Sequence, residues 1–206
     1  MIYEGSPLYY IYDMIDKKMI VEALETIEER LRTDPTSPDL FNLRGMCYYE
    51  LGRHKEALDS FASSLQLYDR DFYPHEMTGK CHFYLEDYIE SIDSFDAASQ
   101  RVSNPNKKVD LLLSAGFAAL IANDVRASQY FPKAIELNSR LTIDAIQQIF
   151  EKLFLDPLMG LTTEEKIRFQ EMINELRDDI GKAKEKIAKW GVVNSASAQP
   201  PATPPR

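Results

Sequence analysis

Hydrophobic residues recur along the chain at three- and four-residue spacings, which is the pattern of helices with one apolar face. Within residues 38–71 this pattern predicts two short helices. Their apolar sides are formed by Phe41, Gly45, Tyr48 and Tyr49 in the first helix and by Ala57, Leu58, Phe61 and Leu65 in the second. Gly52 lies between them, in a turn where a glycine commonly ends a helix. The segment therefore predicts a helix–turn–helix unit.

The same unit recurs 34 residues later in the sequence. Gly45 then falls on Gly79, Cys47 on Cys81 and Phe61 on Phe95. A weaker copy lies upstream, and another lies downstream, where Gly116 replaces the glycine and Ser128 takes the place of Ala57. Small residues at these places let two helices cross closely. We therefore expect four repeat units, near residues 4–37, 38–71, 72–105 and 109–140.

A 34-residue helix–turn–helix unit with these residues resembles the tetratricopeptide repeat. The family pattern is matched in the second unit by Phe41, Gly45, Tyr48, Ala57 and Phe61, and in the third by Gly79, Ser91, Phe95 and Ala98. The resemblance covers about residues 4–140. It implies an all-α solenoid whose concave groove binds peptides or proteins. It implies no chemical reaction.

The resemblance also implies which residues line the groove, because the first helix of each unit faces the concave side. The implied partner-binding residues are Tyr12, Asn42, Met46, Tyr49, Tyr73, Glu76, Lys80, Phe83 and Tyr84. Tyrosine offers a large contact area with little loss of entropy. Leu113, Phe117 and Leu120 extend this surface unless the C-terminal helices of the chain cover them. The groove lacks the Lys, Asn and Arg clamp with which some family members hold an acidic C-terminus.

The fourth unit departs from the pattern, because Pro132 lies well inside its second helix. A proline there removes a hydrogen bond and clashes with the preceding turn. One interpretation is a short helix that ends near Tyr130, with Pro132 starting another turn. The alternative is a kink that opens the groove.

Two further helices are expected after the repeats. A helix over 142–155 has a wide apolar face and would cap the solenoid, so that the repeat domain spans 1–156. A long amphipathic helix over 162–190 carries a heptad-like apolar stripe from Phe169 to Trp190. The segment 163–190 is therefore expected either to pack on the same chain or to form a homodimer. Residues 191–206 are rich in Pro, Ala and Ser and are expected to be disordered.

Composition limits the partners and the compartment. The chain has 206 residues, with 24 Lys and Arg against 33 Asp and Glu, so its net charge of −9 argues against nucleic acid. The longest nearly apolar run, 111–122, is too short to span a membrane. Two Cys and an N-terminus without a signal-peptide pattern predict a cytoplasmic protein.

Candidate chemistry is sparse. Cys47 and Cys81 occupy equivalent places in two repeats and are expected to be buried thiols. The histidines His54, His75 and His82 show no metal-ligand spacing, and no nucleotide-binding or hydrolase motif is present. We therefore expect no enzyme activity, no cofactor and no metal. The predicted function is an adaptor or chaperone-like module that binds a protein or peptide. The alternative is a structural subunit that oligomerises through the C-terminal helix.

Overall fold

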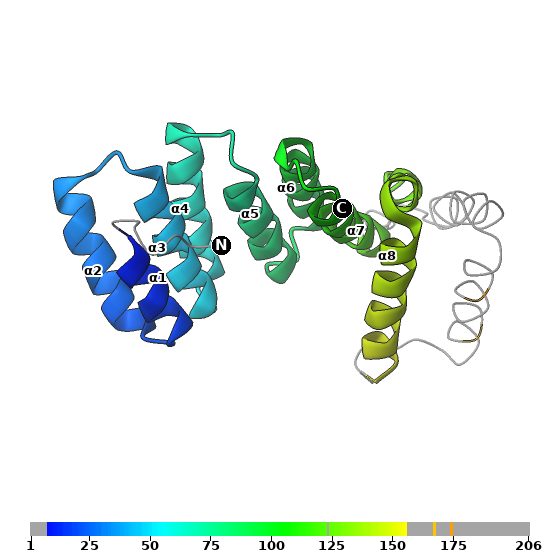
Figure 1. The fold of residues 1–206 in the computed structure, drawn as a ribbon, viewed down its shortest axis with the longest axis horizontal. Coiled ribbons are helices and arrows are strands. Elements are labelled where there is room, and N and C mark those ends of the chain that lie inside the picture. The colour runs from blue at the N-terminus through cyan, green and yellow to red at the C-terminus, as the bar shows by residue number, and fades with distance from the viewer. Residues whose placement is uncertain (1–7, 123, 156–166, 168–173, 175–206) are drawn as a thin grey trace, which may run out of the picture. The chain divides into compact units, whose positions relative to one another are not determined.

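The computed structural model describes residues 8–122 and 124–155 together with Ile167 and Asn174 (Figure 1). These described residues form an all-α fold without strands, which confirms the predicted fold class. The helices are α1 (Tyr9–Asp16), α2 (Ile20–Thr33), α3 (Pro38–Glu50), α4 (His54–Leu67), α5 (Phe72–Tyr84), α6 (Tyr88–Arg101), α7 (Pro105–Ile121) and α8 (Ala127–Leu155).

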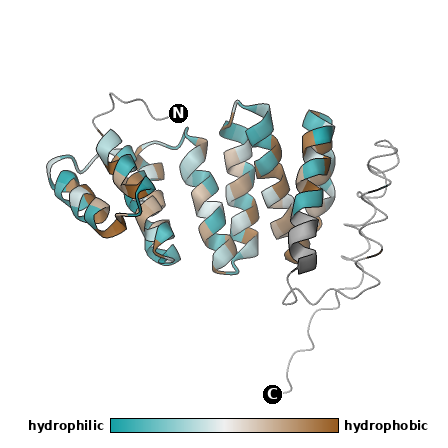
Figure 2. Cartoon of the chain, turned by 60° about the horizontal axis from the view of Figure 1, so that its bottom comes forward, coloured by the Kyte–Doolittle hydropathy of each residue, from teal (hydrophilic) through white to brown (hydrophobic). Residues whose placement is uncertain are grey.

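The chain divides into two compact units, residues 1–101 and 102–206. The expected repeat domain over 1–156 includes all of the first unit and part of the second. In the first unit, the helices pair as α1 with α2, α3 with α4 and α5 with α6, and each pair packs on the next through α2–α3 and α4–α5. Figure 2 shows hydrophobic and hydrophilic residues mixed along these helices, and the buried apolar side chains form the core between them.

A close approach between a glycine and a phenylalanine ring joins the two helices of the middle pairs. A Cβ atom added to Gly45 would lie 2.6 Å from the ring of Phe61, and one added to Gly79 would lie 2.9 Å from the ring of Phe95. Only a residue without a side chain permits this contact. The 34-residue register seen in the sequence therefore rests on a repeated packing contact.

The first pair fills the corresponding places differently. Ile11 and Ile27 lie 34 residues before Gly45 and Phe61, and both are completely buried. Two branched aliphatic side chains thus take the place of a glycine and an aromatic ring. This replacement explains why the first repeat is weak in the sequence although the structure forms the same helix pair.

The turns between paired helices also repeat at 34 residues. Lys18, Gly52 and Glu86 adopt positive φ angles of 61°, 71° and 64°. The sequence identified the turn at Gly52 because glycine adopts this conformation without strain. Lys18 and Glu86 adopt it at some cost, since a side chain disfavours the left-handed region.

The second unit contains α7 and α8. Asn104 caps α7, because its Oδ1 accepts hydrogen bonds from the backbone N–H groups of Asn106 at 2.9 Å and Lys107 at 3.2 Å, and Pro105 occupies the first turn. Gly116 then faces the ring of Phe131 at 3.0 Å from an added Cβ. Because α7 begins at Pro105, the fourth helix pair starts four residues before residue 109, where the fourth repeat unit was expected to begin.

Pro132 does not end its helix, so the prediction of a short helix ending near Tyr130 is wrong. Helix α8 continues through Pro132, and its backbone leaves the helical conformation at Asn138 instead, with φ −159° and ψ 92°. Phe131 is buried against Gly116, which holds this part of α8 in place despite the lost hydrogen bond. Asn138 then caps the following segment, since its Oδ1 accepts from the N–H of Leu141 at 3.0 Å.

The sequence alignment of the fourth unit is also wrong by one residue. Ala127, rather than Ser128, is buried and lies four residues before Phe131, as Ala57 lies four residues before Phe61. The expected helix over 142–155 falls within the last part of α8, where Thr142, Ile143 and Ile146 are buried. The predicted helix over 162–190, including the segment 163–190 that was expected to pack on the chain or to dimerise, and the tail over 191–206 lie outside the described ranges, apart from Ile167 and Asn174.

Candidate functional site

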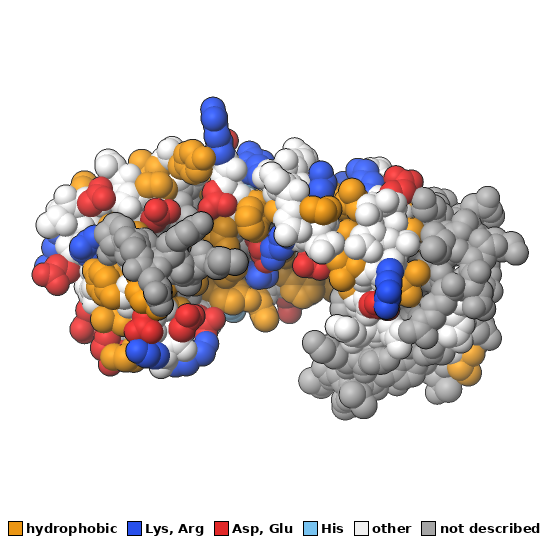
Figure 3. Space-filling model, viewed as in Figure 1, with side chains coloured by type: hydrophobic (Ala, Val, Ile, Leu, Met, Phe, Trp, Pro, Cys, Tyr) orange, Lys and Arg blue, Asp and Glu red, His pale blue; other side chains and the backbone are white. Residues whose placement is uncertain are grey.

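The nine residues expected to bind a partner all lie on the first helices of the first unit. We call this set the first-helix face. It comprises Tyr12 of α1; Asn42, Met46 and Tyr49 of α3; and Tyr73, Glu76, Lys80, Phe83 and Tyr84 of α5. The same spacing of four and then three residues selects positions in α3 and in α5, so these side chains share one side of each helix. Hydrophobic side chains gather over α5 in Figure 3.

Tyr12 of α1 and Tyr73 of α5 are the half-buried tyrosines nearest the start of their helices on this face. Tyr12 packs against the core of the first helix pairs, and Tyr73 packs against the core around Phe61. Burial, followed by the charges of Asp39 and Asp71, raises the pKa of Tyr12. Burial and the neighbouring Tyr12 raise the pKa of Tyr73 well above its usual value. Both phenols therefore remain neutral hydrogen-bond donors over the physiological pH range.

A second aromatic cluster joins α3 and α5. The ring of Tyr49 lies 5.9 Å from that of Tyr84, edge to face, and 5.5 Å from the ring of His54. His54 stacks on Tyr84 with ring centres 4.8 Å apart. Burial and a hydrogen bond with Tyr84 raise the pKa of Tyr49. Tyr84 keeps 62% of its surface exposed while its ring packs on Tyr49 and His54. The cluster therefore presents an aromatic surface to solvent.

His54 is a neighbour of this face that the sequence analysis did not include. A repeated signal was present: His54 lies 34 residues before Tyr88, and Tyr49 lies 34 residues before Phe83. Phe83 and Tyr88 form an equivalent edge-to-face pair at 5.5 Å. The ring of Phe83 therefore contacts Tyr88 of α6. The ring of Tyr84 contacts Tyr49 and His54, and Tyr84 remains 62% exposed.

A partly buried ion pair follows along α5. Lys80 Nζ lies 2.7 Å from Glu76 Oε1, and Glu76 is only 5% exposed. Burying a carboxylate is costly unless a cation compensates for the lost hydration, and Lys80 provides that cation. The pair gives the otherwise aromatic face one strongly polar position.

Asn42 occupies the same place in α3 as Glu76 does in α5, and as Leu8 does just before α1. It is 8% exposed, and its Oδ1 is buried without a hydrogen-bond partner among the described residues. A buried acceptor without a donor destabilises a folded chain. Leu8 shows that an apolar side chain fits this place in the repeat, so packing alone does not require an amide.

The two cysteines are free and buried, as expected. Burial raises the pKa of each thiol to about 12, so both remain protonated and unreactive near neutral pH. Within the described part of the chain, no three His, Cys, Asp or Glu side chains are arranged to hold a metal ion. No helix within residues 8–122 or 124–155 has the length and apolar character needed to cross a membrane.

Comparisons with known proteins identify the repeat and the fold. Residues 38–71 match the sequence model of the tetratricopeptide repeat family. No curated protein matches the sequence. Two crystal structures of MamA are similar at 18% and 16% identity, with TM-scores of 0.62 and 0.61; they cover 88% and 96% of this chain, and 99% and 96% of the MamA chains.

A structure of pilF from Pseudomonas aeruginosa is also similar, at 15% identity with a TM-score of 0.58, covering 90% of this chain and 87% of that chain. Identities this low support a common fold only. With the repeated contacts described above, these matches show that the chain contains a tetratricopeptide repeat at residues 38–71 and has the all-α fold of tetratricopeptide-repeat proteins.

Proposed function

We propose that the chain is a non-catalytic adaptor or chaperone-like module whose first-helix face binds a peptide or helical segment of another protein. Tetratricopeptide-repeat proteins bind protein partners in general, and the properties of this face support that role. Tyr12, Tyr49 and Tyr73 are half-buried and Tyr84 is exposed, so the face offers aromatic contact area with little loss of side-chain entropy. The two free, buried thiols fit the reducing cytoplasm that we propose as its compartment.

The observation that carries the proposal is the unsatisfied Oδ1 of Asn42. Because this oxygen is buried, the side chains that cover it must move for a backbone N–H of a bound segment to supply the missing donor. The stability that the free chain loses at this position would then be recovered on binding. Leucine is accepted at the corresponding Leu8, so a leucine at Asn42 should fit without steric conflict.

The test compares Asn42→Leu with the wild type. We expect Asn42→Leu to raise the free energy of unfolding by about 1 kcal/mol, since it removes a buried unpaired acceptor. The same change should weaken binding to a protein captured by the wild-type chain and identified by mass spectrometry. A variant that is more stable and still binds equally well would remove Asn42 from the binding surface.

A second variant tests the aromatic part of the face. Alanine at both Tyr49 and Phe83 should weaken the captured partner by roughly tenfold or more, because interface aromatics often contribute about 2 kcal/mol or more each. Tyr68→Ala is the matched control, since Tyr68 is an exposed tyrosine at the end of α4 and outside the face. Unchanged binding by the folded double variant would contradict the proposal.

A further inference from the structure

A cleft of about 410 Å³ runs along α2 and involves no residue of the first-helix face. Its apolar wall consists of Val21 and Leu24 of α2 together with Tyr48 of α3. Val21 is 58% exposed, whereas Leu24 and Tyr48 are half-buried. The cleft therefore offers exposed apolar surface on a firmly packed base.

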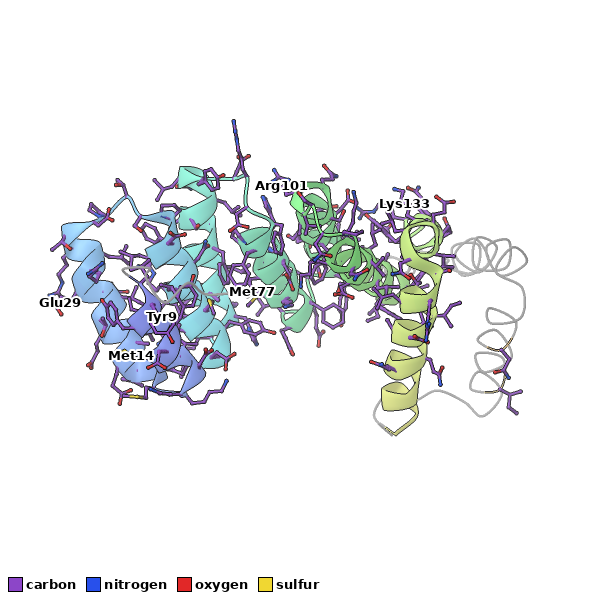
Figure 4. All side chains as sticks on the ribbon, viewed as in Figure 1. Tyr9, Met14, Glu29, Met77, Arg101 and Lys133 are labelled. Carbon is purple, nitrogen blue, oxygen red and sulfur yellow. The ribbon has the colours of Figure 1, made fainter. Side chains whose placement is uncertain are left out.

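Carboxylates dominate the charged rim of the cleft. Glu25, Glu28 and Glu29 line it together with a single cation, Arg32. Glu28 lies 3.5 Å from the guanidinium of Arg44, while Glu25 and Glu29 form no ion pair with any described residue. Figure 4 shows Glu29 on α2, beside α1 with its labelled residues Tyr9 and Met14. The rim is thus negative, with two carboxylates available to an external cation.

The next repeat provides an internal comparison, because α4 has the same length and register as α2. Moving 34 residues along the chain keeps the packed leucine, as Leu24 becomes Leu58. The other residues that line the cleft change: the equivalents of Val21, Glu25, Glu28, Glu29, Arg32 and Tyr48 are Lys55, Asp59, Ala62, Ser63, Gln66 and His82. The repeat therefore folds without this concentration of carboxylates, and its fold does not explain their presence on α2.

We propose that the cleft along α2 is a second protein-binding site, which takes a segment presenting an apolar side chain flanked by lysine or arginine. The apolar residue would contact Val21 and Tyr48, and the flanking cations would lie opposite Glu25 and Glu29. Tyr48 already accepts a cation at one place, since the guanidinium carbon of Arg53 lies 4.6 Å from its ring centre. Opposite charges at an interface favour this class of partner over acidic ones.

The experiment titrates the full-length protein with three short synthetic peptides. The first carries a central Leu-Leu flanked on each side by two Lys, the second replaces the leucines with alanine, and the third replaces the lysines with glutamate. Amide chemical shifts in NMR spectra report the site. We expect only the first peptide to bind well, with shifts concentrated in residues 21–32 and at Tyr48.

Two charge reversals distinguish a specific site from general attraction to an acidic protein. Glu25→Lys and Asp59→Lys change the net charge equally and occupy equivalent places in α2 and α4. Glu25→Lys should weaken the first peptide by roughly tenfold, whereas Asp59→Lys should leave its affinity within about twofold of the wild type. Equal weakening by both variants, or equal affinity for the leucine and alanine peptides, would overturn the proposal.

Two further measurements separate binding in this cleft from binding at the first-helix face and from self-association. The variant with alanine at Tyr49 and Phe83 should bind the first peptide as the wild type does, which distinguishes the cleft from the first-helix face. Sedimentation velocity of the wild type and of Glu25→Lys tests whether the occupant is a second copy of the chain. Self-association that is lost in Glu25→Lys would overturn the assignment to a different protein.

Discussion

The α3–α4 pair and the α7–α8 pair use the same packing contact in two different backbones. Gly45 faces Phe61 in the α3–α4 pair, and Gly116 faces Phe131 in the α7–α8 pair. The second contact spans one residue fewer along the chain, and its second helix contains Pro132 and leaves the helical conformation at Asn138. The close approach of a ring to a glycine therefore defines the pair, while the turn and the rest of the helix can vary.

The two pairs differ in closeness and in chemistry as well. The added Cβ at Gly45 would lie 2.6 Å from the ring, against 3.0 Å at Gly116. Two residues after the glycine, α3 carries the buried Cys47 where α7 carries the buried Ala118. The first unit thus combines tighter packing with a titratable core group, and each of these differences can be tested.

The largest expected effect comes from filling the glycine contact. Gly45→Leu should lower the free energy of unfolding by about 3 kcal/mol, because its side chain must displace the buried Phe61 ring. Gly79→Leu and then Gly116→Leu should cost progressively less, since their added Cβ atoms would lie 2.9 Å and 3.0 Å from the ring. Urea unfolding followed by circular dichroism measures the series.

Ala62→Leu is the control for this series, because Ala62 is exposed on α4. It should change stability by less than about 0.5 kcal/mol. A Gly45→Leu variant as stable as this control would show that the ring contact does not limit the approach of α3 and α4.

A smaller effect is expected at alkaline pH from a thiol in the core. Burial raises the pKa of Cys47 to about 12 from 9.0, so the folded chain holds a proton that the unfolded chain releases. The contribution of the protonated Cys47 thiol to the free energy of unfolding is complete below pH 9 and is lost as the pH rises towards 12. Near pH 10.5 the loss should be about 2 kcal/mol for each such thiol.

Urea unfolding of the wild type and of Cys47→Ala near pH 7 and pH 10.5 measures this loss. The variant should lose less stability between the two pH values, because alanine, as at Ala118, has no proton to release. The buried tyrosines titrate in both proteins, so the difference between them isolates the thiol. An identical loss in the two proteins would show that Cys47 ionises in the folded chain as easily as in the unfolded one.

The sequence predicted the middle pairs best, because there the glycine and the phenylalanine both repeat at 34 residues. It could not identify the left-handed turns at Lys18 and Glu86, since neither residue is a glycine. It also misjudged Pro132, because the buried Phe131 maintains the helix against the local preference of proline. At Pro132, packing between helices therefore outweighed the conformational preference of a single residue.

The candidate site was predictable only in part, because sequence spacing does not define the contacts between side chains of different repeats. Helical spacing identified which side chains share a side of α3 and α5, but not how they meet across repeats. The stacking of His54 on Tyr84 depends on ring orientations that no spacing encodes. The unsatisfied Oδ1 of Asn42 emerges only when all donors around it are known in space.

The smallest expected effect concerns the proline that distinguishes α8 from α4. Pro132 is the sixth residue of α8 and cannot donate a hydrogen bond to the carbonyl of Ser128. Pro132→Ala should restore this bond and raise the free energy of unfolding by about 1 kcal/mol. Pro105→Ala is the matched control, because Pro105 begins α7, where an N–H has no partner within the helix and proline is favourable. We expect that change to give no gain, and hydrogen exchange should show a protected new amide at residue 132 but not at 105. If both changes raised stability equally, the gain at position 132 would not come from the restored hydrogen bond, because no such bond can form at position 105.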